Sequence, residues 1–198
     1  MSSLILTSDA YISTNGALEY EAPALYFTPT NSQIGVVLVD QYAYTNSNYN
    51  LGASTTAVQT LFPFANGGSV NLDIGTYEFE CLFNLSGMSS SSGSFGFALG
   101  GTATKSERWM SIASKATLAT AVAPQVTLNT AANTTLATAT TATVGFAQIT
   151  GTCVVTVAGT LTPQASVTVA AAPGVNSGSY FKIRALANET PYYVGNWG

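Results

Sequence analysis

Histidine is absent from this chain of 198 residues, and charged residues make up only 7% of it. Without histidine the chain lacks the commonest general base and the commonest metal ligand, so serine–histidine and cysteine–histidine nucleophile pairs are excluded. A typical soluble domain is roughly 25% charged. Uncharged polar side chains and exposed backbone must therefore keep much of this surface hydrated.

Basic residues are few and scattered. The five are Lys105, Arg108, Lys115, Lys182 and Arg184, and the net charge is −4. Proteins that bind nucleic acids gather Lys and Arg to displace counterions from phosphates, so we expect no nucleic-acid partner. No stretch approaches the roughly 18 consecutive apolar residues of a membrane-spanning helix, so we expect no membrane partner either.

The two cysteines, Cys81 and Cys153, both lie in apolar, alternating segments. Free cysteine in such segments behaves as a small hydrophobic residue, whereas a disulfide requires an oxidising compartment. We expect two buried thiols, with a disulfide as the alternative. Two separated cysteines without histidine do not form a zinc site.

Alternation of apolar and polar residues with a period of two dominates the chain and predicts β-strands. In the clearest strand, residues 75–85, one face carries Tyr77, Phe79, Cys81, Phe83 and Leu85. Residues 94–99 form the next predicted strand, and the Ser/Gly-rich residues 86–93 predict a flexible loop. We expect these two strands to pair as a long-looped hairpin.

Further strands are predicted along the rest of the chain, at residues 34–44, 108–114, 143–150, 153–157, 160–171 and 179–186. Residues 151–152 and 158–159 are predicted turns. Pro163 indicates an edge position or a bulge in its strand. The Ala/Thr-rich residues 116–142 predict a crossover with one weak strand at residues 125–128.

Many short strands joined by Gly, Ser and Thr turns predict an all-β fold, an antiparallel sandwich or jelly roll. Residues 1–33 differ from the rest in their short motifs and two prolines, Pro23 and Pro29. We expect residues 1–33 to be an N-terminal appendage for attachment and residues 34–198 to be the sandwich domain.

The best catalytic candidates are Glu78 and Glu80, which share one face of a predicted strand about 7 Å apart. That separation falls within the roughly 6.5–9.5 Å of inverting glycosidases. The alternative is a charged outer face that keeps the strand soluble and discourages edge pairing, and we favour it. We therefore predict no enzyme, and no catalytic, cofactor-binding or metal-binding residue.

Tyr42, Tyr44 and Tyr49 precede or enter the Asn-rich residues 45–50. Exposed Tyr beside Asn can stack on sugars and hydrogen-bond their hydroxyls. Tyr is also favoured at subunit interfaces, because its ring is apolar and its hydroxyl polar. We favour the interface interpretation and keep glycan contact as the alternative.

Several short phrases of the sequence resemble bacteriophage tail and appendage proteins. The phrase at residues 16–20 and the one at 25–29 resemble a "GA-hydrophobic-EY … YFTP" element, and residues 75–83 resemble an "AGTYEFE" strand. Similar phrases follow in order at residues 95–98, 158–164, 178–183 and 193–197. Each phrase is short, but together they extend over nearly the whole chain.

The resemblance implies a virion protein with a trimeric jelly roll of the fibre-tip or capsid-decoration type. In such trimers, neighbouring subunits bury apolar faces of each protomer, which would explain the scarcity of charge. Only fifteen residues precede the first phrase. We therefore expect attachment through those residues, through a surface of the module or through another protein.

Two functions follow. The first is a capsid decoration, or cement, protein at the virion surface, in which homotrimers dock on the major capsid protein or another virion protein through Leu4, Ile5 and Leu6. The second is a tail-fibre or receptor-binding tip protein that recognises host glycans. We rank the first slightly ahead of the second, and a glycan-cleaving enzyme last.

Overall fold

The computed structural model describes residues 17–21, 24–30, 33–51, 55–89, 94–117, 120–121, 125–128, 134–137 and 144–187. Every regular element in these ranges is a β-strand. The strands are β1 (Ala17–Glu21), β2 (Ala24–Thr30), β3 (Gln33–Val37), β4 (Gln41–Tyr44), β5 (Tyr49–Asn50), β6 (Thr55–Thr60), β7 (Val70–Leu72), β8 (Gly75–Met88), β9 (Phe95–Gly100), β10 (Thr104–Thr117), β11 (Thr120–Ala121), β12 (Gln125–Leu128), β13 (Thr134–Ala137), β14 (Val144–Val157), β15 (Gly159–Val167), β16 (Ala170–Val175) and β17 (Tyr180–Ala187).

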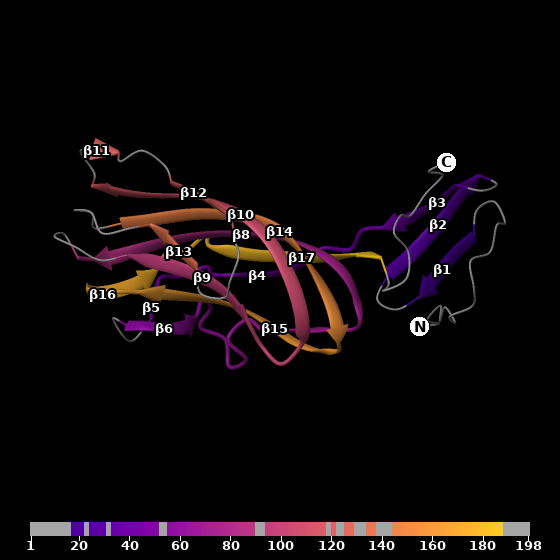
Figure 1. The fold of residues 1–198 in the computed structure, drawn as a ribbon, viewed down its shortest axis with the longest axis horizontal. Helices are drawn as coiled ribbons and strands as arrows, with labels where there is room; N and C mark the ends of the chain where they lie inside the picture. The colour runs from indigo at the N-terminus through magenta and orange to yellow at the C-terminus, as the bar shows by residue number, and fades with distance from the viewer. Residues whose placement is uncertain are drawn as a thin grey trace.

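These strands form three antiparallel sheets. In the large sheet β14 separates β10 from β8, and β8 pairs on its other edge with β16 and β17, which pair in turn with β5 and β4. The second sheet has the order β13-β9-β15-β6, with β7 also paired to β15. These two sheets form a sandwich, and the small sheet β1-β2-β3 lies beyond one end of it (Figure 1). The predicted all-β antiparallel sandwich is confirmed.

Aromatic side chains join the two layers of the sandwich. Phe83 of β8 packs against Phe95 and Phe97 of β9, with ring centroids 5.9 and 6.3 Å apart. Phe97 in turn meets the edge of Trp109 on β10 at 5.5 Å. The buried face of β8 is the one that the alternation predicted, because its odd-numbered residues from Tyr77 to Leu85 are buried and the intervening ones are partly exposed.

The predicted hairpin of residues 75–85 and 94–99 is wrong. β8 and β9 belong to different sheets and face each other across the core instead of pairing edge to edge. The alternation predicted which residues point inward but carried no information on the pairing partner.

The turn predicted at residues 151–152 is also wrong, because β14 continues through them and pairs on both sides, with Gly151 opposite Trp109 and Phe79. A Cβ atom at Gly151 would lie 2.4 Å from the carbonyl oxygen of Arg108 and 2.4 Å from the Cβ of Trp109. Glycine is therefore required here for close approach of the strands. At Ala158 the chain leaves β14 for β15 in the other sheet, close to the predicted turn at residues 158–159.

Pro163 does not lie in an edge strand, because β15 has β9 on one side and β6 with β7 on the other. The register with β9 is regular at this position, with Pro163 opposite Leu99. On the other side β6 ends with Thr60 opposite Gln164, and β7 begins with Val70 opposite Leu161. The carbonyl of Pro163 accepts a hydrogen bond from Leu61 N on that side. The N–H that proline lacks would point into the gap between β6 and β7, where neither strand has a residue paired with Pro163.

The strand predicted at residues 34–44 is two strands in two sheets. β3 completes the small sheet, and β4 pairs with β17 in the large sheet. The expected boundary between residues 33 and 34 falls within β3. Residues 160–171 are likewise divided between β15 and β16, with a break at Val169, whose φ is 50°. The weak strand predicted at residues 125–128 is confirmed as β12.

Candidate interaction surfaces

A ladder of charged and phenolic side chains covers the outer face of β4, β17 and β8. Lys182 lies directly opposite Glu80 and Arg184 opposite Glu78. Lys182 Nζ is 2.8 Å from Glu80 Oε2, and Arg184 Nη2 donates to Glu78 Oε2 at 2.8 Å. We call the set Asp40, Tyr42, Glu78, Glu80, Tyr180, Lys182 and Arg184 the charged ladder.

The remaining contacts of the charged ladder extend it to the sheet edge. Tyr180 donates its hydroxyl to Glu80 Oε1 at 2.6 Å, and Tyr42 donates to Asp40 Oδ2 at 3.1 Å. Arg184 Nη1 is 3.8 Å from Asp40 Oδ1. The Lys182 and Tyr180 hydrogen bonds hold the pKa of Glu80 below its ordinary value, and the bond to Glu80 raises the pKa of Tyr180 to about 12. Glu80 is thus held ionised, which suits an ion pair and not a general acid.

The three tyrosines singled out in the sequence do not share one surface. Tyr42 and Tyr44 of β4 are 59% and 61% exposed. Tyr42 lies opposite Lys182 and its ring centroid is 6.5 Å from that of Tyr180. Tyr49 is half-buried against the core and donates its hydroxyl to the carbonyl of Thr60 at 2.6 Å.

A second, apolar surface lies on the same outer face, over β10, β12 and β14. Its members are Met110, Ile112, Val126, Leu128 and Phe146, which are 43%, 44%, 64%, 69% and 41% exposed. Met110 is opposite Leu128, and Ile112 is opposite Val126, so these side chains share one face. Phe146 lies opposite Ser114 on β10 and joins the same face. We call these five residues the outer-sheet patch.

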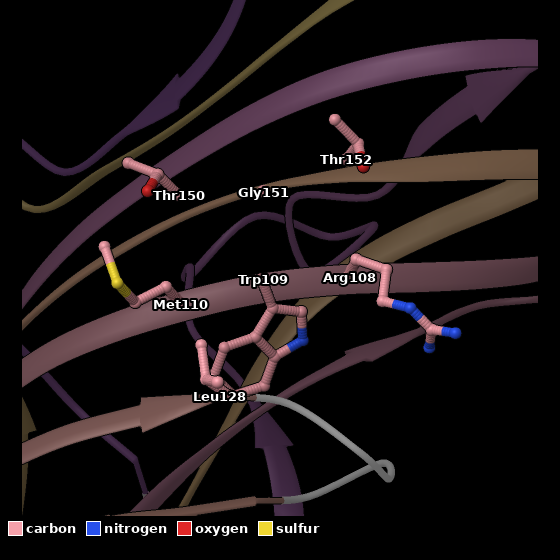
Figure 2. Close-up of a pocket in the computed structure, with 7 residues that line it drawn as sticks. All are labelled: Arg108, Trp109, Met110, Leu128, Thr150, Gly151 and Thr152. Carbon is pink, nitrogen blue, oxygen red and sulfur yellow. The ribbon is translucent and has the colours of Figure 1, made fainter.

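A hollow of about 640 Å³ adjoins the outer-sheet patch. Figure 2 shows its lining residues on β10, on β14 and at the end of β12, which are Arg108, Trp109, Met110, Leu128, Thr150, Gly151 and Thr152. Most of these residues, among them Arg108 and Thr152, are themselves exposed, so the hollow is open. Small-molecule sites enclose most of their ligand's surface, whereas an open hollow suits a protein surface.

The small sheet also presents an apolar face. Leu18, Tyr20, Leu25, Phe27 and Val37 are placed on one side by the register, which sets Leu18 opposite Phe27 and Leu25 opposite both Tyr20 and Val37. All but Leu25 are 37–41% exposed. Residues of the opposite side, such as Tyr26 and Thr28, are 1% exposed. We call these five residues the small-sheet face.

One part of the small-sheet face is turned toward the sandwich. Tyr20, Leu25 and Val37 line a cavity of about 290 Å³ together with residues of the sandwich, including Asp73 and Tyr77. Leu18 and Phe27 do not line that cavity. Both are on the same side of the small sheet and are 41% exposed, so the sandwich leaves this part of the small-sheet face uncovered.

The cysteines are free and buried, as predicted. Burial raises the pKa of both thiols, that of Cys153 to about 12. Within the described ranges, no group of three His, Cys, Asp or Glu residues is placed to hold a metal ion. The same part of the chain contains no helix long and apolar enough to cross a membrane.

Leu4, Ile5 and Leu6, the predicted docking residues, lie outside the described residues. The sequence reasoning missed the outer-sheet patch. A signal for it was present in β10, where Met110 and Ile112 alternate with the buried Trp109 and Ala113. A strand that is apolar on both faces needs cover on both sides, and only one side faces the core of this sandwich.

Comparison of the chain with protein-family models, with curated proteins and with solved structures finds no match.

Proposed function

We propose that this chain is a non-enzymatic structural protein of a bacteriophage virion, in which homotrimers decorate the capsid shell. The observation that carries the proposal is the gathering of exposed apolar side chains. Half of the large hydrophobic residues exposed in the described ranges belong to the small-sheet face or the outer-sheet patch. Scattered exposed hydrophobic residues are normal, but contiguous groups mark interaction surfaces.

The jelly-roll fold is part of the proposal, and the strand order supports it. The strands can be numbered one to eight in chain order, with β6 and β7 counted together: β4, β6 with β7, β8, β9, β13, β14, β15 and β17. In these numbers the large sheet has the order one-eight-three-six, and the second sheet has the order two-seven-four-five. With β5 and β16 left out of the numbering, that order is the one expected of a jelly roll, and it supports this part of the proposal. β10, β11 and β12 are then an insertion between the fourth and fifth strands that widens the large sheet.

The contacts of Glu78 and Glu80 support a non-enzymatic role. Each carboxylate is paired with a cation on the neighbouring strand. Both lie on the outer face of one sheet, while a glycosidase pair faces its substrate from two sides of a cleft. Cross-strand ion pairs of this kind stabilise a sheet by roughly 0.2–1 kcal/mol each.

Electron microscopy of virions whose genome encodes the chain tests the location. Gold-labelled antibody against the purified chain is expected on the capsid shell, at repeated positions. Labelling confined to the tail would contradict the decoration role and favour the receptor-binding role. Virions that carry no label would contradict both. The docking role of Leu4, Ile5 and Leu6 is tested in the same particles, because their joint replacement by Ser is expected to abolish shell labelling.

The receptor-binding alternative rests on Tyr42 and Tyr44. Tyr42 belongs to the charged ladder and Tyr44 lies beside it, opposite Tyr180, and the carboxylates and amino groups of the ladder can hydrogen-bond sugar hydroxyls. Binding of the purified chain to host polysaccharide, lost in Tyr42→Ala and Tyr44→Ala but retained in Tyr49→Phe, would support this role. Absence of wild-type binding would remove it.

A further inference from the structure

The small-sheet face and the outer-sheet patch are alike in chemistry but distant in the fold. None of their ten residues is charged. The small sheet projects from one end of the sandwich, whereas β12, which carries Val126 and Leu128, lies toward the other end (Figure 1). The two surfaces therefore cannot cover each other within one chain, but they can do so between two copies.

The geometry of both surfaces permits direct packing. The outer-sheet patch is formed by three neighbouring antiparallel strands, and the uncovered part of the small-sheet face by Leu18 of β1 and Phe27 of β2, with side chains in register in both. Sheet faces of this kind pack about 10 Å apart with interdigitated side chains. Leu18 and Phe27 lie outside the cavity between the small sheet and its own sandwich and are 41% exposed, and the hollow beside Met110 and Leu128 has room for such side chains.

The surroundings of the outer-sheet patch favour a protein partner. The charged ladder lies on the same sheet face, on the far side of β14, so the apolar patch has a polar border on that side. Protein interfaces have this organisation. If each surface packed on the same surface of a second copy, two separate two-fold interfaces would be needed. A contact between the small-sheet face and the outer-sheet patch covers both surfaces with one interface.

We propose that the small-sheet face of one copy packs on the outer-sheet patch of the next, so that copies join head to tail and close into a ring. This inference rests on the proposed function, which requires a homotrimer, and it names the contact that builds the trimer. A contact between two different surfaces is heterologous, and it generates a closed ring when the rotation between copies closes.

Two single substitutions test the contact. Phe27→Glu places a charge in the small-sheet face, and Leu128→Glu places one in the outer-sheet patch. Each is expected to raise the dissociation constant for self-association at least about thirtyfold, the loss typical of a hot-spot residue. Val157→Glu is the matched control, because Val157 is 56% exposed and belongs to neither surface. It is expected to assemble like the wild type.

Mixing the two variants gives the decisive result. The Phe27→Glu variant keeps an intact outer-sheet patch and the Leu128→Glu variant keeps an intact small-sheet face. Sedimentation velocity is expected to show a heterodimer in the mixture at the highest concentration at which each variant alone stays monomeric. Circular dichroism and thermal melts of each variant establish that it is folded, and Phe27→Ala and Leu128→Ala replace any variant that is not.

Three outcomes would overturn the inference. Trimers that persist in both variants would show that other surfaces build them, and would leave the proposed function standing. Loss of assembly in one variant only would indicate contact between like surfaces, and loss in both without recovery on mixing would contradict packing of one surface on the other. A monomeric wild-type chain would overturn both the head-to-tail contact and the homotrimer that the proposed function requires.

Discussion

At the scale of single residues, the ion pair of Glu80 with Lys182 makes stability depend on pH. Its contacts hold the pKa of Glu80 below the ordinary value of 4.5. A carboxyl whose pKa is lowered on folding adds stability above its unfolded-state pKa, and this stability is lost as the pH falls through its folded-state pKa. The free energy of unfolding is therefore expected to decrease below about pH 4.5.

Glu80→Gln is expected to lower the free energy of unfolding by about 1 kcal/mol at pH 7, since the pair is partly exposed, and by much less at pH 3. Urea denaturation at fixed protein concentration measures both values. Lys182→Gln and the double variant complete a cycle that isolates the pair. An equal loss for Glu80→Gln at both pH values would contradict this account of the charged ladder.

The buried thiols make a second prediction at this scale. Burial raises the pKa of Cys153 to about 12, so almost none of this thiol is ionised at pH 8, and the thiolate is the reactive form. Native protein is expected to react with Ellman's reagent far more slowly than a free thiol, and denatured protein to release two equivalents at once. Rapid labelling of one thiol in the native protein would contradict its burial.

Much of the residue-scale detail could be predicted from the sequence. The inward faces of β8 and β9 and the burial of both cysteines follow from local alternation, which is a property of the strand itself. The partners of Glu78 and Glu80 could not be predicted. They come from β17, about a hundred residues away, and only the register of β8 with β17 brings Lys182 and Arg184 opposite them.

At the scale of elements, Gly151 distinguishes a continuous β14 from two strands joined by a turn. Gly151→Ala is expected to lower the free energy of unfolding by about 1–3 kcal/mol, because the new methyl group meets backbone and Cβ atoms of β10. Gly35→Ala is the matched control, since the nearest atom to its Cβ would be 3.9 Å away. Its expected change is neutral to about 1 kcal/mol stabilising.

Urea denaturation of the two glycine variants at one protein concentration gives the comparison, because assembly couples apparent stability to concentration. Equal changes in the two variants would contradict the close approach at Gly151. A turn at residues 151–152 would tolerate alanine at position 151 without contact with Trp109.

The elements themselves were easier to predict than their pairing. Long strands such as β8 and β10 show their alternation over many residues, so their existence follows from the sequence. The division of residues 34–44 between β3 and β4, and the opposite layers of β8 and β9, depend on contacts between distant segments. A two-residue period is the same in every sheet and does not specify the partner strand.

At the scale of the whole molecule, the structure shows where the apolar part of this weakly charged surface lies. Two sheet faces at different ends of the molecule carry half of the exposed large hydrophobic residues in the described ranges. On the large sheet, the charged ladder forms the polar part of the outer face and the outer-sheet patch forms the apolar part. The resemblance to virion proteins implied that neighbouring subunits cover part of the surface. Only the fold assembles Met110, Val126 and Phe146 into one patch.

Sedimentation equilibrium of the wild-type chain tests the central claim most directly, because both the decoration role and the head-to-tail contact require a homotrimer. The account predicts a single species with three times the chain mass of 20.4 kDa over a wide range of protein concentrations. A species of 20.4 kDa that persists at the highest concentrations would contradict it.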